Sequence, residues 1–281
     1  MTMITAALVE CTKTISSAPA AAAAPSSAQK SSAAEAMADI LKANPGVQVI
    51  GFGEINPFYH YNVKYTVERF ADDILPVLAR NGIKDLALEA VLTDPQVQKE
   101  LDAYYRNGQI GPQLNRCLRG YDYNGYLKLF ARAKALGIKI HPGGMTWSEA
   151  QSTIFLPSYG NTFASYHLAK KAFGYNGKAV LRTVNMIRSY GKKIAFYSGY
   201  LHNNTRIDPS AKSWPQSAHA GDLLRRTLGN KYTEVDIFTP YSIKRENQEP
   251  YIGLNNWARY QPKNGATLVN TKNNRYIILY P

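Results

Sequence analysis

Residues 47–54, VQVIGFGE, are the stretch that decides the fold. A short apolar run, rich in β-branched residues and followed by a turn signal, is typical of a buried strand. The run delivers a carboxylate, Glu54, directly after Gly51 and Gly53, and glycine allows a sharp turn or the close approach of a ligand. In open α/β sheets, ligands bind at the carboxyl ends of the strands. The stretch therefore predicts a buried strand that presents Glu54 to a site.

Two later stretches repeat this design. Residues 84–90, KDLALEA, carry Glu89 near the end of an apolar run, and residues 192–199, KKIAFYSG, lead into His202. Because parallel strands present their carboxyl ends to the same edge of a sheet, we expect Glu54, Glu89 and His202 to converge there. Carboxylates and imidazole suit general acid–base chemistry or the ligation of a divalent metal.

Helix signals alternate with these strands. The clearest is an apolar stripe at helical spacing between Val67 and Leu78, which Pro76 should kink because it cannot donate to the carbonyl of Asp72. Further strands are predicted at residues 138–141, 233–238 and 276–280. Alternating strands and helices predict an α/β fold, with a mostly parallel sheet and helices on both faces.

The first 31 residues differ in composition from the rest. They are rich in Ala, Ser and Pro, which predicts a disordered tail over residues 1–31. A capping box formed by Ser32 and Glu35 then opens a single α/β domain over residues 32–281. No basic region precedes the short apolar stretch of the tail, so it is no standard secretory signal peptide. The location stays open, with export or secretion by another route as one option.

Charge and motifs narrow the function classes. The chain has a formal net charge of +13 and an isoelectric point near 9.6, but its basic residues are scattered, which indicates a solvated basic surface. Its apolar runs are too short for a transmembrane helix, and Cys11 and Cys117 make no disulfide framework. Phosphate-loop, dinucleotide and Gly-x-Ser-x-Gly motifs are absent. We expect a small-molecule or peptide substrate and no nucleic-acid partner.

The combined pattern resembles a known superfamily. A strand ending in Gly-Glu at Glu54, a second strand carrying Glu89, and a third followed by Gly-Tyr-Leu-His at His202 are similar to the ChaN-type haem-uptake lipoproteins, erythromycin esterases and TraB/Tiki-type metalloproteases, whose domain also occurs in some bacterial toxins. The resemblance covers roughly residues 35–240 and implies an α/β fold with its site at strand ends. The usual first motif is Gly-Glu-x-His, and Asn56 stands here in place of its histidine.

The residues and the resemblance together suggest roles. The catalytic candidates are Glu54, Glu89 and His202, and the metal-ligand candidates are Glu54 and His202. The substrate-binding candidates are expected near the same strand ends: Asn56, His60, His141 and Asn203. Structural interpretations stay open for the catalytic three, namely a capping or ion-paired Glu54, a Glu89 paired with a basic residue, and a turn His202 bonded to backbone.

We therefore predict a hydrolase of this superfamily. Glu54 and His202 would activate water or hold a divalent cation, and Glu89 would ligate or orient. With Asn56 at the motif position, His202 is expected to supply most of the imidazole chemistry, with His141 or His60 as the second histidine. One alternative is a non-catalytic protein that binds haem or another small ligand. The other is a toxin or effector domain whose basic surface engages a membrane or an acidic partner.

Overall fold

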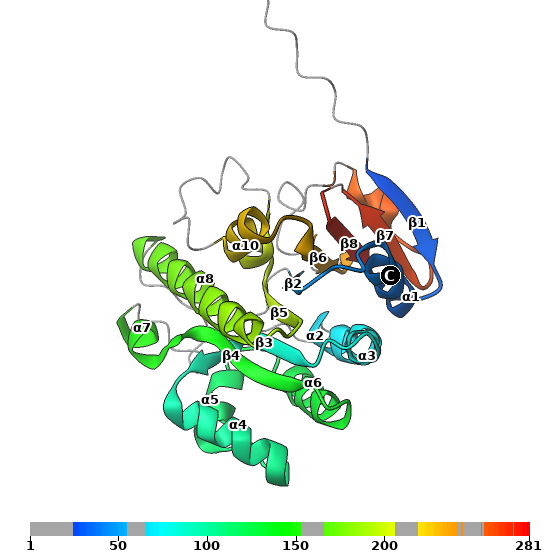
Figure 1. The fold of residues 1–281 in the computed structure, drawn as a ribbon. Helices are drawn as coiled ribbons and strands as arrows, with labels where there is room; N and C mark the ends of the chain where they lie inside the picture. The colour runs from blue at the N-terminus through cyan, green and yellow to red at the C-terminus, as the bar shows by residue number, and fades with distance from the viewer. Residues whose placement is uncertain are drawn as a thin grey trace, which may run out of the picture.

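The computed structural model describes residues 25–54, 66–152, 166–205, 219–240, 243, 254, 256–271 and 273–281. Within these residues the fold is α/β, with an eight-stranded mixed sheet in the order β1-β7-β8-β6-β2-β5-β3-β4 (Figure 1). The strands are β1 (Ser26–Lys30), β2 (Val49–Glu54), β3 (Asp85–Thr93), β4 (Lys139–Thr146), β5 (Ile194–Gly199), β6 (Tyr232–Phe238), β7 (Ala266–Asn270) and β8 (Arg275–Leu279). The helices are α1 (Ala33–Ala43), α2 (Thr66–Arg69), α3 (Leu75–Arg80), α4 (Pro95–Asn107), α5 (Pro112–Leu118), α6 (Tyr123–Ala135), α7 (Trp147–Ser152), α8 (Tyr166–Ser189), α9 (Tyr200–Asn203) and α10 (Ala220–Leu228).

Parallel pairing dominates the sheet, as the alternation of helices and strands predicts. β2 lies between β5 and β6, and β5, β3 and β4 follow outward in parallel. On the other side β8 is parallel to β6, whereas the β8–β7 and β7–β1 pairs are antiparallel. Every residue of β2 is buried, because a central strand of a parallel sheet is covered on both faces.

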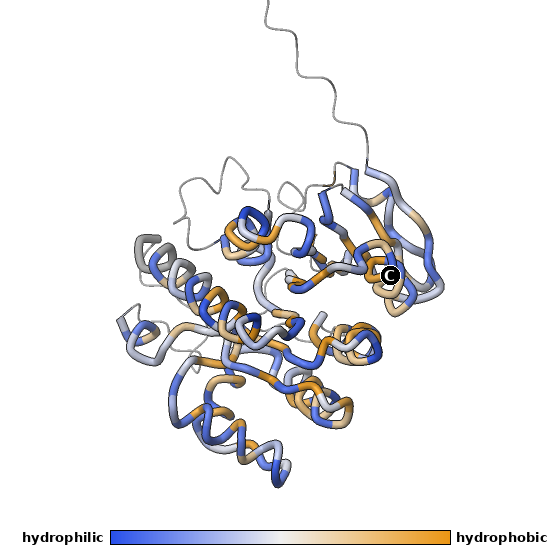
Figure 2. Tube along the Cα trace, viewed as in Figure 1, coloured by the Kyte–Doolittle hydropathy of each residue, from blue (hydrophilic) through white to orange (hydrophobic). Residues whose placement is uncertain are grey.

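Helices cover the two faces of the sheet through separate apolar layers. On one face, Ile50 and Phe52 of β2 belong to a large core that includes residues of α1, α3, α5 and α6. On the other face, Val49 packs in a smaller cluster with Val180 and Val184 of α8. Figure 2 shows the apolar residues gathered along the strands and on the helix sides that meet them. None of the described helices is both long and apolar enough to span a membrane.

The predicted disordered tail, residues 1–31, is wrong at its end, where the structure has the strand β1. Residues 26–30 form an edge strand that pairs antiparallel with β7, and the side chain of Lys30 forms an ion pair with Asp39 of α1. Most of β1 is exposed, and an exposed edge strand needs few apolar residues, so composition alone concealed it. Residues 1–24 lie outside the described residues. Ser32 is confirmed as the N-cap, since its side chain accepts from the Glu35 backbone N–H at 3.2 Å, but the Glu35 carboxylate accepts from the backbone N–H of Ser31 at 2.8 Å and not from that of Ser32.

The predicted kink at Pro76 takes the form of a π-helical turn, η1 (Phe70–Ile74), between α2 and α3. The backbone N–H of Leu75 donates to the carbonyl of Phe70 rather than to that of Ala71. Pro76 has no N–H for the carbonyl of Asp72, and a wide turn just before it accommodates the missing bond.

β4 extends beyond the strand that the sequence predicts. The prediction ends the strand at His141, but β4 continues through Pro142 to Thr146. Because β4 lies at the edge of the sheet, the missing N–H of Pro142 is tolerated there. A Cβ at Gly144 would lie 2.4 Å from the carbonyl oxygen of Glu89, so close packing against β3 explains the glycine. His141 consequently stands near the start of its strand and not at its end.

The turn before β7 gives a stability test of β1. Gly265 and Gly82 both have positive φ, at 71° and 77°. A Cβ at Gly265 would lie 2.2 Å from the carbonyl oxygen of Lys30, whereas a Cβ at Gly82 would meet nothing within 4 Å. Both Gly→Ala variants should lose about 1 kcal/mol from the positive φ. Gly265→Ala should lose at least about 1 kcal/mol more in urea unfolding, through the clash. Equal losses in the two variants would contradict the close packing of Gly265 against Lys30 at the end of β1.

Candidate functional site

Glu54 ends β2 in a buried position, with 4% of its surface exposed. Tyr197 of β5 donates a hydrogen bond from its hydroxyl to Oε2 of Glu54 at 2.7 Å. The other oxygen, Oε1, has no hydrogen-bond partner among the described residues. Burial raises the pKa of Glu54 to about 8 and outweighs the hydrogen bond from Tyr197, which lowers that pKa, while the charges of Asp122 and Glu89 add smaller upward contributions. The carboxyl group is therefore mostly protonated at neutral pH.

Buried tyrosines form the wall around Glu54. The ring of Tyr197 lies 4.7 Å from that of Phe70, and Tyr121 meets Tyr126 edge to face at 5.6 Å. Burial, followed by the charge of Glu54, raises the pKa of both Tyr126 and Tyr197 well above its ordinary value. These phenols stay neutral and give Glu54 an environment of low polarity.

Glu89 and His202 form a buried pair. Nε2 of His202 lies 3.4 Å from Oε1 of Glu89. Asn176 of α8 donates to the same oxygen at 2.7 Å, and the backbone N–H of Gly199 donates to Oε2 at 2.9 Å. Burial pushes the pKa of Glu89 upward, but the charge of His202 and the hydrogen bonds outweigh it and hold that pKa below its ordinary value. Glu89 is therefore ionised and lies within ion-pair distance of the imidazole.

The structure places the two glutamates at the same edge of the sheet but on opposite faces. Successive strand residues point to opposite faces. Glu54 follows the alternation of Phe52, which packs in the large core. Glu89 follows the alternation of Ala87, which packs in the cluster with α8, and its partner Asn176 lies on that helix. The candidate site is thus a rim at the carboxyl ends of β2, β5 and β3, with a protonated carboxyl on one side and an ionised pair on the other.

The two glycines of β2 make room for the segment that carries His202. A Cβ at Gly51 would lie 1.9 Å from Oδ1 of Asn203, and a Cβ at Gly53 would lie 2.8 Å from the Cα of Tyr200. The strand continues through both glycines to Glu54 without a turn. The sequence analysis offered a turn or a close ligand as the reason for these glycines; the structure instead shows α9 packed against the bare backbone.

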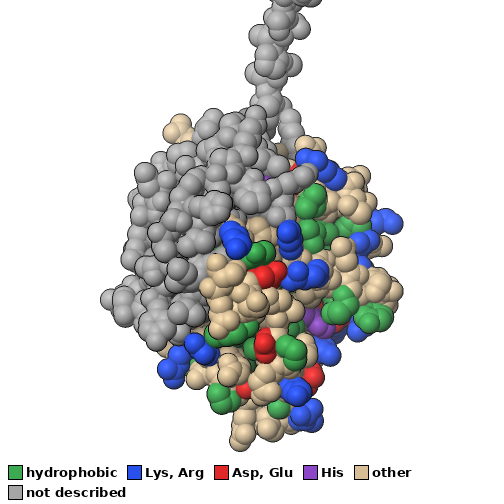
Figure 3. Space-filling model, turned by 90° about the vertical axis from the view of Figure 1, so that its left-hand side faces the viewer, with side chains coloured by type: hydrophobic (Ala, Val, Ile, Leu, Met, Phe, Trp, Pro, Cys, Tyr) green, Lys and Arg blue, Asp and Glu red, His purple; other side chains and the backbone are tan. Residues whose placement is uncertain are grey.

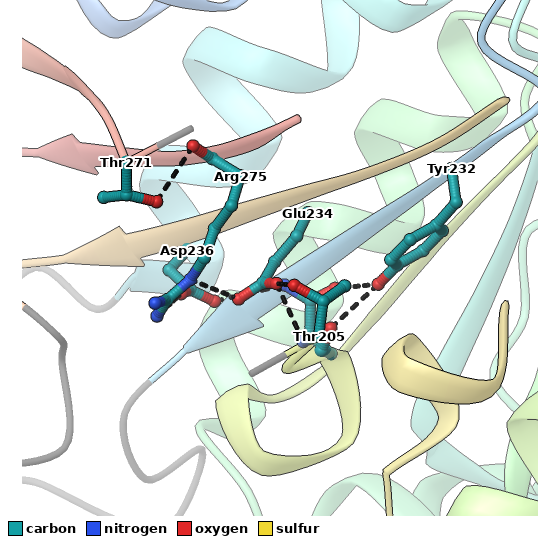
Figure 4. A network of polar contacts seen from close by, with 7 residues as sticks. Thr205, Tyr232, Glu234, Asp236, Thr271 and Arg275 are labelled. Carbon is teal, nitrogen blue, oxygen red and sulfur yellow. Dashed lines mark hydrogen bonds and ion pairs between the residues drawn. The ribbon is translucent and has the colours of Figure 1, made fainter. Parts of the chain in front are cut away.

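A buried ionic network anchors the same segment to the sheet (Figure 4). Arg275 of β8 donates to Glu234 of β6 at 2.6 Å and to Asp236 at 3.1 Å. Asn203 donates from its side-chain amide to Asp236 at 3.1 Å, and the Thr205 backbone N–H donates to Glu234 at 2.8 Å. Burial and the charge of Glu234 raise the pKa of Asp236, while Arg275 and Asn203 oppose the rise. The network fixes both ends of the turn that follows His202.

The remaining predicted residues lie apart from the rim or outside the described residues. Asn203 is fully buried and its side-chain oxygen accepts from Tyr232 at 2.6 Å, so its contacts within the described residues are structural, and substrate binding by Asn203 stays a prediction. His141 bonds through Nε2 to Asp85 at 2.7 Å, near the amino ends of the strands, because β4 runs on past it. Asn56 and His60, predicted to bind substrate, lie outside the described residues.

Metal ligation is a separate question from the acid–base arrangement. Glu54 and His202 were predicted to share a divalent ion. Across the described part of the chain, no three His, Cys, Asp or Glu side chains gather in a way that could hold a metal. The described residues by themselves therefore supply no such group, and metal binding by Glu54 and His202 stays a prediction.

Three contributors to the rim were missed in the sequence. Tyr197 lies within the predicted strand, but its partner Glu54 belongs to a strand distant in sequence. Asn176 is a buried polar residue on α8, where it also accepts from the Met145 backbone N–H at 3.0 Å. A polar residue at an apolar position of a helical stripe was the available signal for Asn176. Charged residues inside the predicted strand 233–238 were the signal for the ionic network.

Comparisons with known proteins show only a distant likeness. No family model matches the chain, and no curated protein matches it. The RRSP effector domain of a MARTX toxin from Vibrio vulnificus is a similar solved structure, with 20% identity over 63% of this chain and 31% of that chain and a TM-score of 0.43. The type III effector HopBA1 has 8% identity over 87% of this chain and 93% of its own, with a TM-score of 0.46. A succinoglycan biosynthesis protein has 14% identity over 72% and 68%, with a TM-score of 0.43.

These comparisons describe the arrangement of helices and strands alone. This chain spans about a third of the length of the toxin structures that it matches first, 31% of one and 37% of the other. None of the three structures described above is named as a ChaN, erythromycin-esterase or TraB/Tiki protein, so that resemblance stays a prediction. The function proposed below rests on the residues of this chain.

The ionic network gives a second stability test. Arg275→Met leaves Glu234 and Asp236 buried without their cation, and removing one partner of a buried ionic group costs about 3–5 kcal/mol. Urea unfolding should show a loss of that size. Adding Glu234→Gln and Asp236→Asn to the same chain should restore part of it. Arg259→Met removes an exposed cation and serves as the control. A loss no greater than that of the control would show that the network is not structural.

The protonation of Glu54 can be tested without a substrate. The pKa of its side chain rises from 4.5 in the reference state to about 8 in the folded protein. Folding therefore takes up a proton between these values, and this contribution to stability is lost as pH rises through that window. The free energy of unfolding of Glu54→Gln minus that of wild type should grow by about 1.4 kcal/mol per pH unit there. Chemical denaturation near pH 5 and near pH 8 measures it, and a constant difference would contradict a protonated Glu54.

Proposed function

We propose that this protein is a hydrolase that uses Glu54 as general acid and His202, oriented by Glu89, as general base. The observation that supports the proposal most directly is the opposite protonation of two buried carboxyl groups at one rim. Glu54 has a pKa raised to about 8, whereas that of Glu89 is lowered. Titratable groups whose surroundings push their pKa values apart are characteristic of acid–base pairs in enzymes.

The pair of His202 and Glu89 has the features of a base with its orienting group. Glu89 is held from three sides, by the imidazole, by Asn176 and by the Gly199 backbone N–H. A carboxylate so fixed selects one ring orientation and stabilises the imidazolium that forms when His202 takes a proton. In the proposed reaction His202 removes a proton from water as the water oxygen bonds to the electrophilic atom of the substrate.

Glu54 has the features of the complementary acid. Its proton would pass to the leaving group as the scissile bond breaks, and the Tyr197 hydroxyl would stabilise the carboxylate left behind. The partnerless Oε1 supports a role toward a ligand, since a buried polar atom without a partner costs free energy and calls for an explanation. The substrate class expected from the sequence, a small molecule or a peptide, is part of the proposal.

Esterase assays test this assignment. With p-nitrophenyl acetate and butyrate as probes, Glu54→Gln, Glu89→Gln and His202→Gln should each lower kcat/KM by about a hundredfold or more. His141→Gln is the matched control, because His141 and Asp85 form a similar buried pair at the opposite edge of the sheet. Circular dichroism confirms the fold of each variant. Equal activity in wild type and the three site variants would refute the acid–base assignment and favour a non-catalytic binding role.

The pH profile separates a catalytic from a structural role for Glu54. The kcat/KM of wild type should fall as pH rises through about 8, because the acid loses its proton. Tyr197→Phe removes the hydrogen bond that favours the ionised carboxyl, so the pKa of Glu54 rises further and the alkaline limb should move to higher pH. An unmoved limb in Tyr197→Phe assigns that limb to another group.

A further inference from the structure

Four helix-to-strand turns of this fold have the same sequence pattern, Gly-x-Lys. They occur at residues 82–84 (GIK), 137–139 (GIK), 191–193 (GKK) and 229–231 (GNK). Each follows a helix and leads into a parallel strand, namely β3, β4, β5 and β6. All four glycines have positive φ, at 77°, 65°, 72° and 55°, which explains the glycine in each turn. Nothing in the turn geometry requires the lysine two residues later.

The sheet places these lysines in one row. The Lys139 backbone N–H donates to the carbonyl of Lys84 at 2.7 Å, and the Gln48 N–H donates to the carbonyl of Lys231 at 2.8 Å. Ile194, which follows Lys193, donates in turn to the carbonyl of Gln48 at 3.0 Å. The row therefore runs across five adjacent strands, about 4.8 Å apart, with only the β2 position taken by an uncharged Gln. Lys84, Lys139, Lys192, Lys193 and Lys231 are all exposed, and we name them the amino-edge lysines.

Few carboxylates compensate this charge. Lys192 lies 3.8 Å from Asp85, which is itself buried and bonded to His141, and Lys84 donates to the carbonyl of Leu136 at 2.8 Å. For the other three amino-edge lysines, the described residues offer no carboxylate within ion-pair distance. Basic residues in the last turn of a helix are explained by the helix dipole. Lys231 ends the short 3-10 helix η5 (Gly229–Lys231), but the other four lysines stand beyond the helix ends. A row of like charges stores repulsion that an anionic surface would relieve.

Exposed apolar side chains accompany the lysines. Met186 is 47% exposed and Tyr190 is 70% exposed, and they are the large apolar residues in the exposed class among the described residues. Met186 lies in the last turn of α8, and Tyr190 follows the helix directly, shortly before Lys192 and Lys193. α8 has no Asp or Glu along its length. Figure 3 shows the side of the molecule that α7 and α8 occupy in Figure 1, with basic side chains spread over its described part and apolar and acidic ones among them.

We propose that the amino edge of the sheet, together with the end of α8, docks the protein on an anionic lipid surface. The ammonium group of lysine is a compact charge on a flexible side chain, and it is attracted to anionic lipid headgroups. Tyrosine and methionine insert into the region between headgroups and acyl chains, where an apolar body with a polar tip is favoured. This combination fits a membrane better than nucleic acid, whose recognition uses guanidinium forks and aromatic stacking. The docked orientation points the opposite edge, with Glu54 and His202, toward the aqueous phase.

Vesicle flotation with the full chain tests the proposal. Wild type should float with vesicles that contain phosphatidylserine and not with pure phosphatidylcholine. The triple variant Lys139→Gln, Lys193→Gln and Lys231→Gln should bind at least about tenfold more weakly. Lys99→Gln, Lys171→Gln and Lys263→Gln, at exposed sites elsewhere, remove the same charge and should change binding less than about twofold. Met186→Ser with Tyr190→Ser should also weaken binding, and raised salt should release the protein.

Three outcomes would overturn the proposal. One is no preference for phosphatidylserine. Another is equal weakening by the two triple variants, which would show an effect of net charge alone. The third is tight binding of a duplex or single-stranded oligonucleotide through the amino-edge lysines without vesicle binding, which would assign the surface to nucleic acid. Esterase activity of the amino-edge triple variant should equal that of wild type. The membrane proposal and the hydrolase proposal can therefore be tested independently.

Discussion

The contact between the bare backbone of β2 and the segment after β5 is the constraint on which the site depends. At Gly51 and Gly53 the strand has no side chains, and Tyr200 and Asn203 occupy that space. Only from this position can Asn203 reach Asp236 while His202 reaches Glu89. Because the two glycines of β2 leave room for α9, this one short helix contacts both the ionic network, through Asn203, and Glu89, through His202.

Much of the fold follows from local patterns, and its exceptions have physical reasons. Apolar runs ending in turn signals identified β2, β3 and β5, because a strand covered on both faces is mostly apolar. β1 was not predicted, because its mostly exposed residues do not form an apolar run. The end of β4 was misplaced because Pro142 reads as a stop, although an edge strand tolerates it. Strand order, and with it the pairing of β2 with strands far along the chain, is set by tertiary packing that no local pattern records.

The candidate site likewise combines features that local sequence patterns predict with features that only tertiary packing sets. The sequence placed Glu54, Glu89 and His202 at strand ends, and the structure has all three at the carboxyl edge of the sheet. It could not place the two glutamates on opposite faces, since that depends on the register between β3 and β5. The ionic network requires β8 beside β6, and the lysine row requires four turns brought level by parallel pairing. Scattered basic residues in the sequence therefore became an ordered edge only in three dimensions.

The place of β2 between β5 and β6 also governs the order in which the chain can fold. During synthesis β2 emerges before both of its neighbours, and all of residues 55–193 must follow before β5 can pair with it. Such distant pairings slow folding, because the loop must close before any hydrogen bond of the strand is gained. Until then this largely apolar strand lacks both neighbours and is open to pairing with other chains. The strand order that brings the rim residues together thus leaves β2 exposed during synthesis, so the nascent protein needs other segments to shield this strand until β5 is made.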